Sequence, residues 1–234
     1  MATFVLVPGA WLGGWAWNRI IPLLEKEGHR AIPVTLTGAG DRVHLASPNV
    51  GVETAIQDVL NVIQYNDLKN FVLVGHSFGG KVVPAVADRI PEKVAMLLYL
   101  DAFRPAKNVR TPQGSFNPSE YGPLQPGQWS IPLTNEIVDM IGKDVVGSDR
   151  QWFLSKATPW PLNHATQPVT LTSKFEEIKN SFIFCKSGGD PVEEILSGKW
   201  GRIDGPYRII DSGHWPMITR PEELVSDLIA LSES

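Results

Sequence analysis

The sequence predicts an α/β protein with a doubly wound, mostly parallel sheet, and three observations favour this class. Apolar runs typical of buried strands alternate with amphipathic stretches typical of helices through the first half of the chain. A long irregular segment then interrupts the alternation, which resumes further along the chain. With 234 residues, 43% of them hydrophobic and 20% charged, the chain fits one large domain with a single core.

The opening elements form a strand–helix–strand–helix pattern. "TFVLVP" (3–8) is an apolar run typical of a strand, and "WNRIIPLLEKEG" (17–28) has helical periodicity and ends at a glycine. "AIPV" (31–34) predicts a short second strand, and "VETAIQDVLNVIQ" (52–64) a second amphipathic helix. Such alternation indicates parallel strands with helices on both faces of the sheet.

The next elements, "FVLVG" (71–75), "KVVPAVADRI" (81–90) and "VAMLLYL" (94–100), continue as strand, helix and strand. Pro84 lies deep enough in the expected helix to predict a kink there. The last run carries no charge, as expected of a strand buried on both faces, and Asp101 follows it directly. A carboxylate at the end of a buried strand costs free energy unless it is compensated, so the sequence predicts a partner for Asp101.

Residues 103–175 break the pattern, because they are rich in Pro, Gly, Trp and polar residues and contain only short helical stretches such as "TNEIVDMI". Alternation resumes with "SFIFC" (181–185), "YRIID" (207–211) and "PEELVSDLIALS" (221–232). An irregular segment between two strands of such a sheet predicts a cap over the carboxyl edge. We therefore expect one domain, residues 1–234, with a cap insertion at residues 103–175.

Charge and cysteine content narrow the expected partners and compartment. The net charge of −4 argues against nucleic acid or an anionic membrane surface as the main partner. The single cysteine, Cys185, excludes an intramolecular disulfide, and its apolar surroundings predict a buried, inert thiol. The chain enters a strand pattern without a basic leader, and its apolar runs are too short to span a bilayer. These features predict a cytoplasmic protein.

The segment "FVLVGHSFGGKVV" contains the pattern G-x-S-x-G as Gly75-His76-Ser77-Phe78-Gly79. Alone the pattern is weak, and a glycine-rich strand–helix turn would explain it. Here it follows an apolar strand and precedes a helix, which is the context of a nucleophile elbow. Small flanking residues avoid clashes in such a strained turn, and the helix directs its N-terminal N–H groups at the serine oxygen. We therefore predict Ser77 as the nucleophile.

A serine nucleophile requires a base, and the chain has five histidines. His214, in "YRIIDSGHWPM", follows the last expected strand, so its loop is expected at the same edge of the sheet as Ser77. We predict His214 as the general base, with a structural histidine as the alternative. The other four are interpreted as a solvated residue, the variable residue of the elbow, and two polar loop or pocket residues: His29, His76, His44 and His164.

With "GHSFGG" and "DSGHWPM" placed, the sequence resembles the α/β-hydrolase superfamily, and more closely the small esterases of the plant methylesterase and hydroxynitrile lyase branch. "FVLVPGAWLGGWAWNRIIPLLEKEGH" is similar to the opening of that branch, and "LTGAGDRVHL", "LLYLDAF" and "DSGHWPMITRPEELV" are similar to bacterial relatives. The resemblance covers essentially the whole chain outside the cap. It implies an oxyanion hole formed by the backbone N–H groups of Ala10 and Phe78, with no metal and no organic cofactor. One departure is Pro8-Gly9, where the branch usually has His-Gly.

The resemblance leaves two positions for the acid that orients the histidine. The usual position is the turn after the penultimate strand, where "CKSGGDPVEE" offers Asp190. Some relatives carry the acid one strand earlier, where "LLYLDAF" places Asp101. We favour Asp101, because a strand end shields an orienting carboxylate from water, whereas Asp190 follows two glycines. The structural alternatives are a strand-end cap for Asp101 and a turn residue for Asp190, and Asp211 is expected to brace the loop of His214.

These features predict a serine hydrolase that cleaves a small carboxylic ester with an apolar portion through an acyl-enzyme, as a monomer or homodimer. One alternative is a hydroxynitrile lyase, which is disfavoured because that branch has a threonine and a lysine where this chain has Gly9 and Trp215. Another is a small-ligand receptor on the same scaffold. An epoxide hydrolase or dehalogenase would need an aspartate in place of Ser77. The expected pocket residues, which could equally pack the cap onto the sheet, are Trp11, Phe103, Trp129, Trp152, Trp160 and Trp215.

Overall fold

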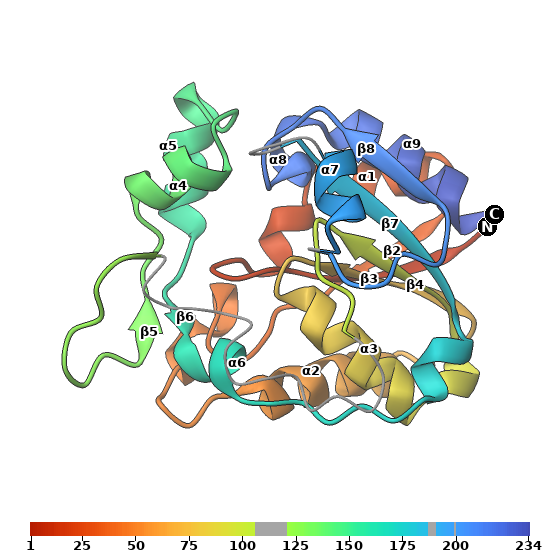
Figure 1. Cartoon of the computed structure of the whole chain (residues 1–234), viewed down its shortest axis with the longest axis horizontal. Helices are drawn as coiled ribbons and strands as arrows, with labels where there is room; N and C mark the ends of the chain where they lie inside the picture. Colours follow the sequence, from red (N-terminus) through yellow and green to blue (C-terminus); the bar gives the residue numbers. More distant parts are fainter. Residues whose placement is uncertain (106–120, 187–190, 199) are drawn as a thin grey trace.

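The computed structural model describes residues 1–105, 121–186, 191–198 and 200–234. Its main sheet has six strands, all parallel, in the order β2-β1-β3-β4-β7-β8 (Figure 1). The predicted parallel, doubly wound sheet is thereby confirmed, and the strand order reverses between β1 and β3, where such sheets form a crevice. The strands are β1 (Thr3–Val7), β2 (Arg30–Pro33), β3 (Phe71–His76), β4 (Val94–Leu100), β7 (Lys179–Cys185) and β8 (Tyr207–Ile210).

Helices cover both faces of the main sheet. In Figure 1, α1 (Ile21–Lys26) and α9 (Pro221–Ser232) lie above it, while α2 (Val52–Tyr65) and α3 (Gly79–Arg89) lie below it. Within the described ranges, none of the helices is long and apolar enough to cross a membrane. The remaining short elements outside the region between β4 and β7 are η1 (Gly14–Trp17), η2 (Gly40–Leu45), η3 (Pro91–Lys93), α7 (Pro191–Leu196) and α8 (Pro216–Thr219).

Most of the described part of the region between β4 and β7 stands at the edge of the sheet where the strands end, on the left of Figure 1. Its last element, residues 174–177, lies instead by the end of α3, where the Phe175 N–H donates to the Asp88 carboxylate (3.3 Å). The region contacts the loops that follow β1 and β8, because Thr158 N–H donates to the Trp11 carbonyl oxygen (3.0 Å) and His214 N–H to that of Ile141 (2.8 Å). Most of this region therefore faces the crevice of the sheet. Its elements are an antiparallel pair, β5 (Ser130–Ile131) and β6 (Trp160–Pro161), with α4 (Asn135–Ile141), α5 (Gly147–Lys156), α6 (Leu162–Thr166) and η5 (Lys174–Glu177).

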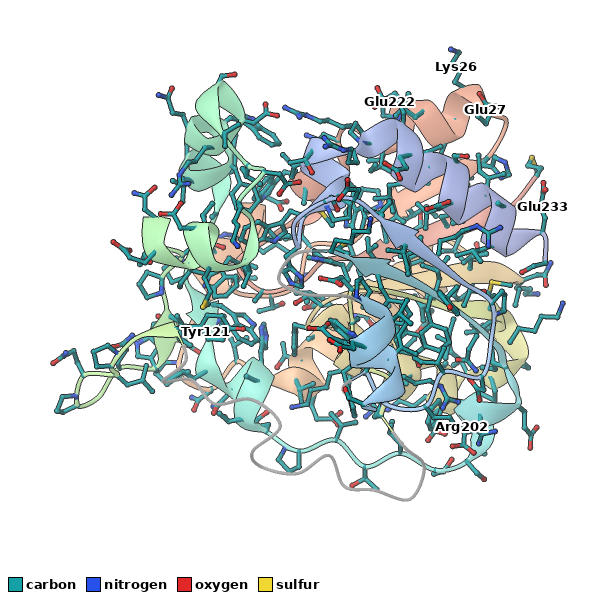
Figure 2. All side chains as sticks on the ribbon, turned by 45° about the horizontal axis from the view of Figure 1, so that its top comes forward. Lys26, Glu27, Tyr121, Arg202, Glu222 and Glu233 are labelled. Carbon is teal, nitrogen blue, oxygen red and sulfur yellow. The ribbon has the colours of Figure 1, made fainter. Side chains whose placement is uncertain are left out.

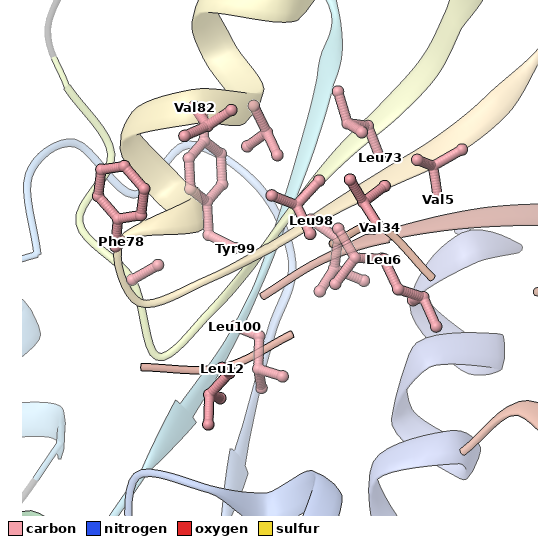
Figure 3. Packing of buried hydrophobic residues seen from close by; sticks show 14 of the residues in the cluster. Val5, Leu6, Leu12, Val34, Leu73, Phe78, Val82, Leu98, Tyr99 and Leu100 are labelled. Carbon is pink, nitrogen blue, oxygen red and sulfur yellow. The ribbon is translucent and has the colours of Figure 1, made fainter. Parts of the chain in front are cut away.

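The core lies on both sides of the central strands. All six residues of β3 are buried, and Figure 3 shows side chains such as Val5, Leu6 and Leu98 packed together along the neighbouring strands. Each such aliphatic side chain contributes roughly 1.5–3 kcal/mol by leaving water. Charged side chains of α1 and α9 point outward, for example Lys26 and Glu222 in Figure 2. The strand ends are thus held by a packed core and make a rigid platform for a site.

Two helices differ from their predicted course. The helix predicted at 17–28 begins only at Ile21, because Pro22 favours the first turn of a helix, and residues 14–17 form a separate 3-10 turn. Helix α3 runs from Gly79 to Arg89 instead of 81–90 and continues through Pro84, and the kink expected at Pro84 stays a prediction. Pro84 lies in the second turn, so the missing N–H affects only the carbonyl of Gly80 at the start of the helix.

Candidate active site

Ser77 occupies a sharp turn between β3 and α3. Its φ is +51°, in the left-handed region that a residue with a side chain adopts at a cost of order 1 kcal/mol. Ser77 N–H donates to the Leu100 carbonyl oxygen (3.0 Å), which fixes the turn against β4. A Cβ on Gly79 would lie 2.9 Å from the Val7 carbonyl oxygen, so only glycine allows this turn to approach β1. The local sequence therefore places a partly exposed hydroxyl at the crevice of the sheet.

The loop after β1 lies directly against this turn. A Cβ on Gly9 would lie 2.8 Å from the Ser77 Cβ and 2.7 Å from the His76 Nδ1, so glycine is required where the two segments meet. Among the described residues, neither the Ala10 N–H nor the Phe78 N–H donates a hydrogen bond. Two backbone N–H groups without an acceptor among the described residues thus belong to the two segments that meet at Ser77.

His214 and Asp101 form a direct hydrogen bond, in which the imidazole Nδ1 lies 2.6 Å from the carboxylate Oδ2. The second carboxylate oxygen, Oδ1, accepts from the Cys185 N–H at 2.9 Å. The Asp101 side chain is buried, so its attraction to the imidazole is little screened by water. Because the carboxylate accepts at Nδ1, the proton of a neutral imidazole lies there, and Nε2 is left free to accept another proton.

His76 connects the turn of Ser77 to His214. The His76 ring, next to Ser77 in the chain, packs on the His214 ring with 4.7 Å between ring centroids. No hydrogen bond joins the Ser77 hydroxyl to the His214 ring within the described part of the chain. Such bonds are commonly long in the absence of substrate and shorten in the reacting complex.

Aromatic side chains of the loop after β1 and of the Ser77 turn contact rings from the region between β4 and β7. The Trp11 indole N–H donates to the Ile131 carbonyl oxygen (2.9 Å), and its ring contacts that of Trp160 edge-on. The Phe78 ring contacts Trp160 on one side and stacks on His164 on the other, at 5.1 Å with an interplanar angle of 10°. Trp11 and Trp160, both predicted as pocket residues, are therefore brought together beside the two segments that meet at Ser77.

Of the other predicted pocket residues, Trp215 contacts the His214 ring edge-on, with 5.8 Å between ring centroids. Trp152 packs against Trp15 and beneath the guanidinium of Arg19, and Trp215 is buried against Phe153. These rings join α5 to the body of the protein. The Phe103 side chain is 47% exposed, and the Trp129 carbonyl accepts from Leu162 N–H.

Of the two other acidic residues considered, the described residues include only Asp211. Asp190 lies outside the residues that the structure describes. Asp211 is exposed and lines a shallow depression of about 360 Å³ together with Lys186 and Arg220. In the described ranges, no three His, Cys, Asp or Glu side chains gather as a metal site would require.

Lys81 is a functional candidate that sequence reasoning missed. From the first turn of α3, its ammonium group donates to the carbonyl oxygens of Ala165 and Gln167, both at 2.6 Å, and so ties α6 to the helix that follows Ser77. Burial lowers the pKa of Lys81 to about 8. No local pattern could have revealed it, because its partners are main-chain atoms more than eighty positions away.

The burial of His164 predicts that the folded protein loses stability in acid. Its ring is almost fully buried, and burial, assisted by the positive charge of Lys81, lowers its pKa from 6.5 to about 4. The unfolded chain therefore binds this proton more tightly, and stability that is complete above pH 6.5 is lost as the pH falls toward 4. Between pH 7 and pH 4, we expect the free energy of unfolding to fall by about 3 kcal/mol more in the wild-type protein than in His164→Gln. Urea midpoints across this range measure the difference.

The matched control for this prediction is His44→Gln, which removes an exposed histidine and hence one titrating group from the unfolded chain. Equal pH dependence of wild-type protein and His164→Gln would show that His164 is not held neutral in the folded state.

Comparison with known proteins places this chain among hydrolases. The model of the "Alpha/beta hydrolase family" matches residues 4–228. The chain is 34% identical over 246 residues to a carbendazim hydrolyzing esterase of Nocardioides sp. (strain SG-4G), with 99% of this chain and 100% of the relative covered. It is 27% identical to the polyneuridine aldehyde esterase of Rauvolfia serpentina, covering 99% and 96%. An extracellular alpha/beta-hydrolase from a Paenibacillus species has the same fold, with a TM-score of 0.84, 23% identity and full coverage of both chains.

Proposed function

The chain belongs to the alpha/beta hydrolase family, and from this premise we propose that it is a serine esterase that cleaves a carboxylic ester with an apolar portion. Its relatives include several named esterases, so hydrolysis of small-molecule esters is its general activity. The observation that carries the serine mechanism is the 2.6 Å hydrogen bond between His214 and the buried Asp101, beside the strained turn of Ser77.

In the proposed mechanism, the His214 Nε2 takes the hydroxyl proton as Ser77 attacks the ester carbonyl carbon. The resulting oxyanion accepts hydrogen bonds from the N–H groups of Ala10 and Phe78, each worth roughly 3 kcal/mol in the transition state. Asp101 holds the imidazole in the required tautomer and stabilises its charged form. His214 then protonates the leaving alcohol, and a water molecule repeats the sequence on the acyl-enzyme.

Residues 103–175, of which 106–120 lie outside the described residues, supply the cap in this proposal. Trp11 and Trp160 form an apolar wall for the substrate. Flat aromatic and small apolar esters suit such a wall. The named relatives add methyl esters and carbendazim as first substrates to test. The residue after the base is Trp215, buried against Phe153, so no cation stands there to receive a leaving cyanide, which favours the esterase over the lyase alternative.

A substrate panel tests this function. We expect purified protein to turn over at least one of methyl benzoate, methyl butyrate, p-nitrophenyl acetate and carbendazim many times per active site. A fluorophosphonate should label one serine per chain and stop this turnover. Labelling with at most one slow turnover on every ester would instead indicate a ligand receptor, and cyanide release from mandelonitrile without ester turnover would indicate a lyase.

A further inference from the structure

His76 lies between three parts of the site. Its Nε2 is 2.8 Å from the His214 carbonyl oxygen, and its ring packs on the His214 ring. On another side it meets the Trp17 ring at a right angle, and its Nδ1 lies where a Cβ on Gly9 would touch it. The side chain has no exposed surface. His76 thus joins the chain segments of the nucleophile, the oxyanion loop and the base.

The hydrogen-bond pattern fixes the tautomer of His76. A carbonyl oxygen only accepts, so the proton must lie on Nε2, which donates it to His214. The buried Nδ1 has no partner among the described residues. Burial and the neighbouring His214 both lower the pKa of His76 well below its usual value, so the ring is neutral. Because the His76 ring is neutral, it does not repel the positive charge that His214 acquires during acyl transfer.

We propose that His76 is a positioning residue, which holds the main chain of His214 so that the imidazole faces both Asp101 and Ser77. This inference rests on the proposed serine mechanism. Asp101 fixes one ring nitrogen of the base, but it does not fix the loop between β8 and α8 from which the base extends. The main chain of His214 is held at two points, because its N–H donates to the Ile141 carbonyl oxygen (2.8 Å) and its own carbonyl oxygen accepts from His76 (2.8 Å). Because His76 precedes Ser77 directly, movement of the nucleophile turn and movement of the base are coupled.

Two substitutions separate the hydrogen bond from the shape of the ring. His76→Phe keeps an aromatic ring in the space but removes the donor, whereas His76→Gln places an amide N–H near the position of Nε2. We expect His76→Phe to lower kcat about 10- to 100-fold with KM nearly unchanged, because displacements near 1 Å have effects of this size. His76→Gln is expected to recover most of kcat. His29→Phe is the matched control, because this half-buried histidine lies at the start of β1, where its Nδ1 accepts from the Ala2 N–H.

Nitrogen NMR of histidine-labelled protein supplies a readout that needs no turnover. It should show His76 as the neutral tautomer protonated at Nε2. The proposal is overturned if the ring is protonated at Nδ1, if His76→Phe keeps wild-type kcat, or if both variants lose the same activity. If wild-type protein hydrolyses no ester, the proposed function fails, and the tautomer still decides whether His76 holds the loop of His214.

Discussion

Ser77→Ala is expected to lower kcat for ester hydrolysis by about 10⁶-fold, because an attack by water must then replace the covalent step. Alanine meets the same backbone strain as serine at a φ of +51°, and the change adds no atoms beside Gly9. The fold and the substrate affinity should therefore persist. Single-turnover kinetics, with an isotope-labelled ester and mass detection of the acyl-enzyme, measures both the rate and the loss of the intermediate.

The control for this prediction is Ser155→Ala, which removes an exposed hydroxyl that donates to the Trp152 carbonyl oxygen of its own helix. It should hydrolyse esters at the wild-type rate. Residual activity of Ser77→Ala within about tenfold of wild type, in correctly folded protein, would remove Ser77 from the chemistry and with it the acyl-enzyme mechanism.

The sheet and the turn of Ser77 could be predicted because their signals are local. The apolar run of β3, the glycines around Ser77 and the following helix adjoin in sequence, and Gly79 is dictated by the approach to β1. The end of a buried strand also identified Asp101 as a carboxylate in need of a partner. The predicted start of α1 was wrong, because the preference of Pro22 for the first turn of a helix outweighed the amphipathic pattern that precedes it.

The contacts that set the fine geometry could not be predicted, because they join distant segments through main-chain atoms. His76 contacts a carbonyl group 138 positions away, and Cys185, predicted only as an inert thiol, contributes its backbone N–H to Asp101. The aromatic residues show the same limit. Trp11 and Trp152 were both predicted as pocket residues, yet the ring of Trp11 contacts Trp160 and that of Trp152 packs on Arg19.

Asp101→Asn is expected to lower kcat by about 10⁴-fold at neutral pH while KM changes little. The Cys185 N–H must be met by an oxygen, so the asparagine would turn its carbonyl oxygen toward Cys185 and its NH₂ group toward His214. The Nδ1 of His214 would then have to accept instead of donate, which places the imidazole proton on Nε2. A base protonated at Nε2 is unable to take the proton of Ser77, so the wrong tautomer, and not a lost contact, is the cause of the effect.

Steady-state kinetics of three variants separates this effect from a general loss of stability. Asp58→Asn is the matched control, because Asp58 is also buried and also accepts a backbone N–H, that of Thr37 at 2.6 Å, but has no contact with His214. It should cost stability and leave kcat near wild type. Asp190→Asn tests the alternative acid. A large loss in Asp190→Asn with a small one in Asp101→Asn would mean that the carboxylate beside His214 is a strand-end cap, and that the base is oriented from the turn after β7.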